Sequence, residues 1–167
     1  GGKKAGKESF TDRLTKLEII GVYSPIGHEM QMPFSMVLSS VLAKQRRILY
    51  INLMQNTGFL QLFDSQAEYD IGDLTLRLRR GTTESEQFFQ SIYEMGDFSY
   101  VAPFRNPEQL GEFQMDDYRK LLAHLEENTK FDTVVFDFGT GIPSIAAFLE
   151  ECSSIYCPVK EGYFYEC

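Results

Sequence analysis

The sequence has no apolar run approaching the roughly 18–20 residues that a membrane span needs, and its N-terminus has no signal-peptide core. It is also short of positive charge, because 16 lysine and arginine residues stand against 24 aspartate and glutamate residues. The resulting formal net charge of -8 repels nucleic acid and anionic membrane. We therefore expect a cytoplasmic protein with no nucleic-acid partner and no membrane span.

Cysteine and histidine are scarce as well. The cysteines lie near the C-terminus, at Cys152, Cys157 and Cys167. Their number is odd and their spacing fits no metal or redox motif, which predicts reduced thiols. Of the two histidines, His28 stands beside Glu29 in a loop, and His124 is expected on the solvent side of a helix. Neither setting is typical of a metal site or of a nucleophile activated by histidine.

The sequence does contain many apolar residues. They make up 43% of its 167 residues, which is enough to form the buried core of one domain. Residues 1–16 are small, basic and weakly patterned, which predicts a linker or tag remnant, and residues 17–167 form the expected domain. Apolar segments predict strands at 17–23, 48–53, 98–103, 131–138 and 154–159. Periodic segments predict helices at 33–47, 70–80, 84–95, 116–128 and 143–151. This alternation predicts an α/β fold with three αβα layers and a mostly parallel sheet.

Three of the helices carry further expectations. In the 33–47 helix one broad apolar face is predicted to form core, and it consists of Met36, Val37, Leu38, Val41 and Leu42. The 70–80 segment alternates like a strand but also fits a helix capped by Asp73, and we favour the helix. The 84–95 helix would place Phe88, Ile92 and Met95 on one face.

The loop from Ser24 to Pro33 joins the first strand to the first helix, which is the frame of a phosphate-binding loop. A working loop of the G-x-x-x-x-G-K-[ST] kind needs glycines to bring backbone N–H groups to phosphate, a lysine for its charge and a hydroxyl for magnesium. Here Gly27 is the only glycine, and Gln31 and Met32 stand where the lysine and the hydroxyl would be. The frame is therefore present without its phosphate chemistry.

Four segments, IIGVYSPIG, ILYINL, FDTVVFDFGTG and CSSIYCPVKEG, together resemble the ParA/MinD family of deviant-Walker P-loop ATPases. The subgroup that they resemble includes the CpaE-like pilus-assembly proteins of bacteria, and the resemblance covers roughly residues 17–162. The family loop S-P-K-G-G-V-G-K-T-T falls on 24–33. This alignment implies that Ile26 replaces the signature lysine, His28 and Met30 two glycines, Gln31 the phosphate lysine, and Met32 the magnesium-binding threonine.

The resemblance also bears on the strand ends. Asn52 and Met54 fall where the family has acidic residues, and only Asp137 is kept, at the position of a Walker B aspartate. One carboxylate without the lysine and threonine does not supply the charge that stabilises phosphoryl transfer. Asp137 itself has two interpretations, a residual magnesium ligand or a cap of the following turn, and we favour the cap. We predict no catalytic residue, and the residual nucleotide-site positions are Ser24, Gly27, Gln31, Met32, Asn52 and Asp137.

The sequence thus predicts a P-loop NTPase-like domain that has become a non-hydrolysing pseudo-ATPase and acts as a protein-interaction or regulatory module without a cofactor. The alternative is an ATPase that binds ATP and magnesium at a non-standard site and works in pilus assembly, positioning or partitioning. A protein partner is expected, and a homodimer stays open. The apolar cluster at 59–63 and the aromatic run at 163–165 are each either core or contact surface. Family members continue with further strands, so the resemblance implies a domain lacking its C-terminal strands.

Overall fold

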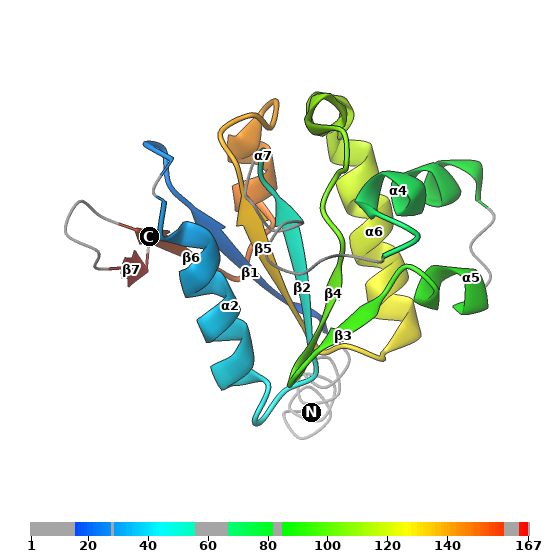
Figure 1. Cartoon of the computed structure of the whole chain (residues 1–167), viewed down its shortest axis with the longest axis horizontal. Helices are drawn as coiled ribbons and strands as arrows, with labels where there is room; N and C mark the ends of the chain where they lie inside the picture. The colour runs from blue at the N-terminus through cyan, green and yellow to red at the C-terminus, as the bar shows by residue number, and fades with distance from the viewer. Residues whose placement is uncertain (1–15, 28, 56–66, 82–84, 159–163, 167) are drawn as a thin grey trace, which may run out of the picture.

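The computed structural model describes residues 16–27, 29–55, 67–81, 85–158 and 164–166 (Figure 1). Over these ranges a seven-stranded sheet has the order β3-β4-β2-β5-β1-β6-β7. The strands are β1 (Glu18–Tyr23), β2 (Ile48–Leu53), β3 (Tyr93–Met95), β4 (Phe98–Val101), β5 (Thr133–Phe138), β6 (Ser154–Pro158) and β7 (Phe164–Glu166). The five central strands are parallel, and β3 and β7 pair antiparallel at the edges. The predicted mostly parallel α/β sheet is confirmed.

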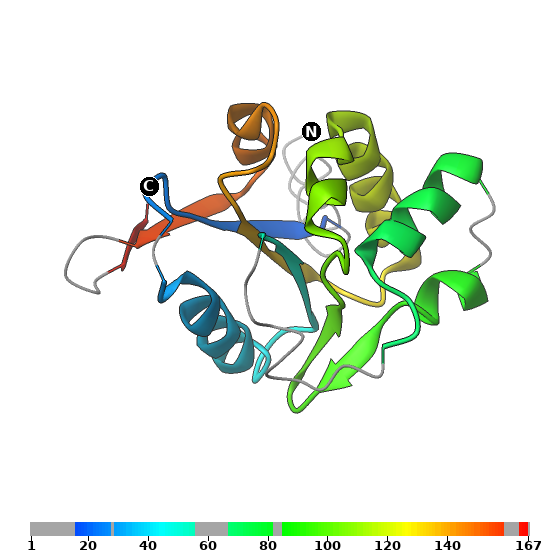
Figure 2. The same ribbon diagram turned by 45° about the horizontal axis from the view of Figure 1, so that its top comes forward.

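Helices cover both faces of this sheet. They are α2 (Gln31–Leu42), α4 (Ile71–Arg80), α5 (Ser85–Phe89), α6 (Met115–Asn128) and α7 (Ile145–Glu150), with a 3-10 turn η1 (Pro107–Glu112). Within the described ranges α2 is alone on its face, whereas α4, α6 and α7 lie on the other (Figure 2). Because side chains alternate along a strand, Leu49 and Ile51 of β2 join the α4–α6–α7 core while Tyr50 and Asn52 point toward α2.

The two central strands β2 and β5 are buried at every position, as expected for parallel strands covered on both faces. Between β5 and the helices, aromatic rings fill the core: Tyr118 of α6 and Phe148 of α7 have centroids 4.8 Å apart. Phe136 and Phe138 of β5 stack on each other with centroids 5.4 Å apart, and the ring of Phe136 lies 5.1 Å from that of Tyr118 in a tilted contact. This packing holds β5, and with it the residues at its end, in a fixed position.

The α2 helix differs from the prediction. Val37 and Val41 are 63% and 56% exposed, whereas Ser35 and Ser39 are wholly buried. Burial of the serines is tolerated because each hydroxyl lies within hydrogen-bond distance of the carbonyl four residues earlier, 3.0 Å for Ser35 to Gln31 and 2.7 Å for Ser39 to Ser35, and Ser35 also reaches the buried carboxylate of Asp137. The small serines therefore face the sheet, and the predicted apolar face is wrong in part.

The 70–80 segment is a helix, as favoured, but Asp70 rather than Asp73 is its N-cap. The Oδ1 of Asp70 accepts from the N–H of Asp73, and the Asp73 carboxylate accepts from the N–H of Asp70, both at 2.9 Å. This reciprocal capping box satisfies two N–H groups of the first turn. At the other end Gly81 takes the left-handed conformation, with φ 68°.

The predicted 84–95 helix is wrong beyond Phe89. Residues 93–95 form β3, which returns to β4 through a two-residue turn at Gly96 and Asp97. Gly96 has φ 59°, the left-handed conformation that such hairpin turns require. The turn at Gly96 and Asp97 therefore places Met95 in a strand, although the spacing of Phe88, Ile92 and Met95 is helical.

Three further expectations have outcomes. His124 is half-buried with its ring 4.2 Å from that of Phe88, so the solvent-side placement is wrong. Cys157 is disulfide-bonded, which contradicts a fully reduced set, while Cys152 is a free thiol. No helix in the described ranges is long and apolar enough to cross a membrane. His28, the 59–63 cluster and Tyr163 lie outside the described residues.

Candidate functional site

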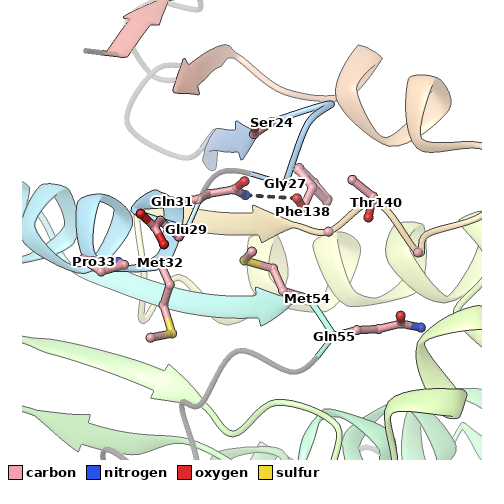
Figure 3. Close-up of a pocket in the computed structure, with 12 residues that line it drawn as sticks. Ser24, Gly27, Glu29, Gln31, Met32, Pro33, Met54, Gln55, Phe138 and Thr140 are labelled. Atoms are coloured by element: carbon pink, nitrogen blue, oxygen red, sulfur yellow. Dashed lines mark hydrogen bonds between the residues drawn. The ribbon is translucent and has the colours of Figure 1, made fainter. Parts of the chain in front are cut away.

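A cavity of about 380 Å³ opens at the carboxyl ends of β1, β2 and β5. The chain leaves β1 through α2 on one face of the sheet and leaves β5 through α7 on the other, so the strand order reverses here. Crevices of this kind are the usual ligand sites of open α/β sheets. The lining residues are Ser24, Gly27, Glu29, Gln31, Met32, Pro33, Met54, Gln55, Phe138, Gly139, Thr140 and Gly141 (Figure 3).

The loop after β1 begins with a tight turn. The N–H of Gly27 donates to the carbonyl of Ser24 at 3.1 Å, and Pro25 occupies the second position that proline favours in such turns. Gly27 has φ 66°, which explains why glycine is needed there. The turn leaves Ile26, predicted to replace the signature lysine, 72% exposed to solvent.

Gln31, which the sequence predicts to stand at the position of the phosphate lysine, is buried, and its side-chain amide is engaged by the ends of two strands. Its Nε2 lies 3.0 Å from the carbonyl oxygens of both Val22 and Phe138, and 3.4 Å from Oδ1 of Asp137. Its two amide hydrogens thus serve the ends of β1 and β5, as Figure 3 shows for Phe138. The donor that would meet a phosphate in a working loop is engaged within the protein.

Asp137 lies beneath the cavity, wholly buried, and does not line it. Ser35 of α2 and Tyr50 of β2 each donate a hydroxyl hydrogen bond to its carboxylate, and Gln31 adds the longer contact. The expected role of Asp137 as a cap of the following turn is therefore wrong. Its actual role is to tie the first turn of α2 to β5 and β2.

Burial raises the pKa of Asp137 to about 7, although the hydrogen bonds from Ser35, Tyr50 and Gln31 oppose the rise. The pKa of the Tyr50 hydroxyl is raised well above its usual value, first by burial and then by the charge of Asp137. Tyr50 therefore stays protonated and remains a donor, while Asp137 changes charge near neutral pH.

Asn52 is wholly buried beside this cluster. Its Nδ2 donates to the Tyr50 hydroxyl at 3.1 Å, and its Oδ1 accepts from the N–H of Met54 at 3.0 Å. The amide thus fixes both the tyrosine and the turn of the chain after β2. An aspartate there would place a second buried carboxyl group close to Asp137.

The opposite wall of the cavity is a turn at 139–141. The N–H of Gly139 donates to the carbonyl of Leu53 at 2.9 Å. A Cβ at Gly139 would lie 2.9 Å from Cα of Met54 and 3.0 Å from that carbonyl, so only glycine fits without backbone movement. The turn therefore brings Thr140 and Gly141 close to the end of β2.

The electrostatics of the cavity are unsuited to an anion. Among the described lining residues Glu29 is the one that carries charge, and neither lysine nor arginine is present. The described ranges also contain no cluster of three or more histidine, cysteine, aspartate or glutamate residues that could hold a metal ion. The site can offer amide, hydroxyl and backbone hydrogen bonds, together with the apolar surfaces of Met32 and Met54.

Of the six positions singled out in the sequence, four line the cavity, namely Ser24, Gly27, Gln31 and Met32, and two, Asn52 and Asp137, lie below it. Sequence reasoning missed Ser35 and Tyr50. A tyrosine within an otherwise aliphatic buried strand is a usable signal, because a buried hydroxyl usually finds a partner. The serine spaced four residues after Gln31 is a second one.

The fold of the chain is shared with ParA/MinD-type P-loop ATPases. A ParA family ATPase from Chlorobium tepidum superposes with a TM-score of 0.69 at 13% identity, over 87% of this chain and 62% of that one. Cobyrinic acid a,c-diamide synthase from Mycobacterium smegmatis, solved with an ATP analogue and magnesium, gives a TM-score of 0.64 at 15% identity, over 86% and 60%. The MinC:MinD cell division complex of Aquifex aeolicus gives 0.61 at 14% identity, over 84% and 55%.

These likenesses define the class of fold and nothing finer. The chain spans less than two thirds of the length of each of these three structures. No protein-family model matches the sequence, and no curated protein matches it.

Proposed function

We propose that this domain is a non-hydrolysing, ParA/MinD-like pseudo-ATPase that serves as a protein-interaction or regulatory module. The observation that carries the proposal is the position of Gln31. Its amide joins the ends of β1 and β5 through the carbonyls of Val22 and Phe138. The residue therefore holds the fold together at the point where a P-loop lysine would bind phosphate.

ATP and magnesium do not fit the residues present. Glu29 would repel a triphosphate at the cavity wall, and the thioether of Met32 is a poor ligand for magnesium, which prefers oxygen. Asp137 is wholly buried below the cavity, and its carboxylate accepts hydrogen bonds from the hydroxyl groups of Ser35 and Tyr50. The site thus lacks the charges by which P-loop enzymes stabilise phosphoryl transfer.

The proposal includes the finer expectations from the sequence: a degenerate loop at 24–33, the CpaE-like subgroup, a domain over 17–167, and a protein partner. MinD, one of the structurally similar proteins, was solved in a complex with MinC. This supports the proposal that the present domain, which has the same fold, binds a protein partner. The cytoplasmic location is also part of the proposal, although the disulfide at Cys157 is less common in a reducing compartment.

Titration calorimetry with ATP and magnesium, paired with a phosphate-release assay, tests the proposal. We expect neither binding nor turnover from the wild type. For the alternative, an ATPase with a non-standard site, the double variant Gln31→Lys/Met32→Thr should raise turnover steeply, whereas a double variant that binds no nucleotide would mean that the pocket itself is lost. Gln55→Lys adds the same charge at a different lining residue and is the matched control, which should gain much less.

Low-micromolar ATP binding by the wild type, with phosphate release that Asp137→Asn abolishes, would overturn the proposal in favour of an ATPase with a non-standard site. Circular dichroism of each variant separates loss of the site from loss of the fold.

A further inference from the structure

A second hollow lies on the face of the sheet that α4 and α6 cover, and it shares no lining residue with the cavity described above. It runs between α4 and η1 toward the start of α6, where α4 and α6 lie side by side (Figure 1). Two adjoining cavities form it, of about 50 Å³ and about 570 Å³, and both are lined by Arg79 and Glu112. We call the two cavities together the α4–η1 groove.

The smaller cavity is the apolar end of the groove. The rings of Phe104 and Phe113, with centroids 6.2 Å apart, belong to its lining. Leu76 also lines it and is 45% exposed, whereas the other leucines of α4, Leu74 and Leu78, are buried. Since one water molecule needs about 10–15 Å³ of cavity, a cavity of about 50 Å³ has room for one aliphatic side chain.

The larger cavity is the acidic end of the groove. Three carboxylates line it, those of Glu112, Asp116 and Asp117, and they stand against one guanidinium, that of Arg79. Nε and Nη2 of Arg79 each lie 2.7 Å from the carboxylate of Asp117, so these two charges neutralise one another. Asp116 has an ion pair with the exposed Lys120 at 2.9 Å, and the exposed Glu112 has none with any residue that the structure describes. The acidic end therefore retains negative charge for a cationic group.

The two elements that form the groove are fixed to each other at both ends. Gly72 of α4 comes so near to η1 that an added Cβ would lie 3.1 Å from Oε1 of Gln109. Toward the other end, Nη2 of Arg79 donates to the carbonyl of Glu112 at 3.0 Å. A groove whose walls are already fixed loses little conformational freedom when a ligand enters, and this favours binding.

We propose that the α4–η1 groove binds an extended segment of a partner protein that carries an aliphatic residue and, two residues away, a lysine or arginine. The aliphatic side chain fills the apolar end beside Leu76. The cationic side chain reaches the carboxylates of Glu112 and Asp116. The spacing follows from the shared wall of the two cavities, because alternate side chains of an extended segment point to the same side, about 7 Å apart.

Charge selects a basic segment over the alternatives. An acidic segment or a phosphate-bearing ligand would bring like charge to Glu112 and Asp116, and like charges at such distances repel. The whole chain has a net charge of -8, so a basic partner is also attracted before contact, which raises the rate of association.

This proposal deepens the proposed function and rests on it, because it gives the interaction module a surface and a class of partner. The nucleotide titration concerns the cavity at the ends of β1, β2 and β5, whereas the experiment below concerns the α4–η1 groove. Failure of one is therefore distinguishable from failure of the other.

Retention of the whole chain on immobilised pools of nonapeptides tests the proposal. One pool has leucine and arginine fixed two residues apart, in either order, with every other position randomised. In the two control pools, glutamate replaces the arginine or aspartate replaces the leucine. We expect the leucine–arginine pool to retain about tenfold more protein than either control. The first control turns attraction into repulsion at Glu112 and Asp116, and the second places a charge in the apolar end.

Variants of the protein locate the contact. Leu76→Asn should lower retention on the leucine–arginine pool about fivefold, because it removes an apolar wall. Glu112→Lys should lower it about tenfold and should also gain retention on the leucine–glutamate pool, which a merely structural defect does not produce. The matched controls are Val37→Asn, at an exposed apolar residue of α2, and Glu126→Lys, at an exposed acidic residue of α6 outside the groove. Both controls should behave as the wild type.

Equal retention on the three pools would overturn the proposal, and so would a preference for the leucine–glutamate pool. Wild-type retention by both Leu76→Asn and Glu112→Lys would overturn it by placing the contact elsewhere. Loss of retention by Glu112→Lys without the gain on the leucine–glutamate pool would overturn the pairing of the cationic side chain with Glu112. Circular dichroism shows whether each variant has kept its fold.

Discussion

The hydroxyl of Tyr50 in β2 donates a hydrogen bond to Oδ2 of Asp137 in the neighbouring strand β5, and both residues are wholly buried. Asn52, two residues along β2, donates to the same hydroxyl at 3.1 Å. The tyrosine thus links the amide to the carboxylate. Because Asp137 is also bonded to Ser35 of α2, this cluster fixes the start of the helix below the cavity.

Replacing Tyr50 with phenylalanine should destabilise the domain by about 1–3 kcal/mol, since the variant removes the hydrogen-bond partner of Oδ2 of Asp137 and of Nδ2 of Asn52. Urea unfolding followed by circular dichroism measures the free energy. Tyr156→Phe is the control, because that tyrosine is half-buried and its ring packs against Phe34 with centroids 6.2 Å apart. Equal losses in the two variants would show that the Tyr50 hydroxyl has no special structural role.

Asp137 should make the stability fall as pH rises through neutrality. Its pKa is about 7 in the folded protein and near 3.9 in an unfolded chain, so the folded state binds more protons between these values. Stability from this group is full below about pH 4, declines as pH rises, and is lost above about pH 7. The total is at most about 4 kcal/mol.

The difference between the wild type and Asp137→Asn isolates this contribution, because the other ionisable groups are common to both proteins. Urea unfolding at a series of pH values from acid to alkaline should give the wild type the steeper decline. Parallel stability curves would mean that the carboxyl group titrates with its ordinary pKa.

The sequence predicted the features that depend on neighbouring residues, and it missed those that depend on contacts between residues far apart in the chain. The strands around Tyr50 and Asp137 were recognisable because continuous apolar runs are typical of covered parallel strands. The buried face of α2 was mispredicted at Val37. Ser35 faces the sheet because its hydroxyl donates a hydrogen bond to Asp137, which is 102 residues away in the sequence. No local pattern contains such a contact.

The candidate site divides in the same way. Gln31 and Met32 were identified from their positions in the loop, since the strand–loop–helix frame is local. That Gln31 turns its amide inward depends on the carbonyl of Phe138, 107 residues away. The direction in which the Gln31 side chain points, toward a ligand or into the protein, therefore depends on how the strands come together in the sheet.

Gly139→Ala should destabilise the domain and disturb the cavity. The added Cβ would lie 2.9 Å from Cα of Met54, which is backbone and moves only with β2. The expected loss is about 1–3 kcal/mol, measured as a lower urea midpoint with an unchanged slope. Gly111→Ala is the matched control, because a Cβ there meets nothing within 4 Å. A Gly139→Ala protein as stable as the control would contradict the close approach of the two turns.

Asp117 should stabilise α6 at neutral pH and lose this effect in acid. Burial pushes its pKa upward, but hydrogen bonds from the Arg79 side chain and the Gln114 N–H outweigh burial and hold the pKa below its usual value. A carboxyl group with a lowered pKa contributes stability above its unfolded pKa near 3.9 and loses it as pH falls through the folded pKa. Asp117→Asn should therefore cost on the order of 1–2 kcal/mol at pH 7, since Arg79 is partly exposed, and less in acid. The control is Asp116→Asn, because Asp116 is exposed and lies in the same helical turn. Thermal unfolding of each variant and of the wild type, at pH 7 and in acid, gives the comparison. A penalty for Asp117→Asn that is the same at both pH values would show that the ionised carboxylate does not provide the stability.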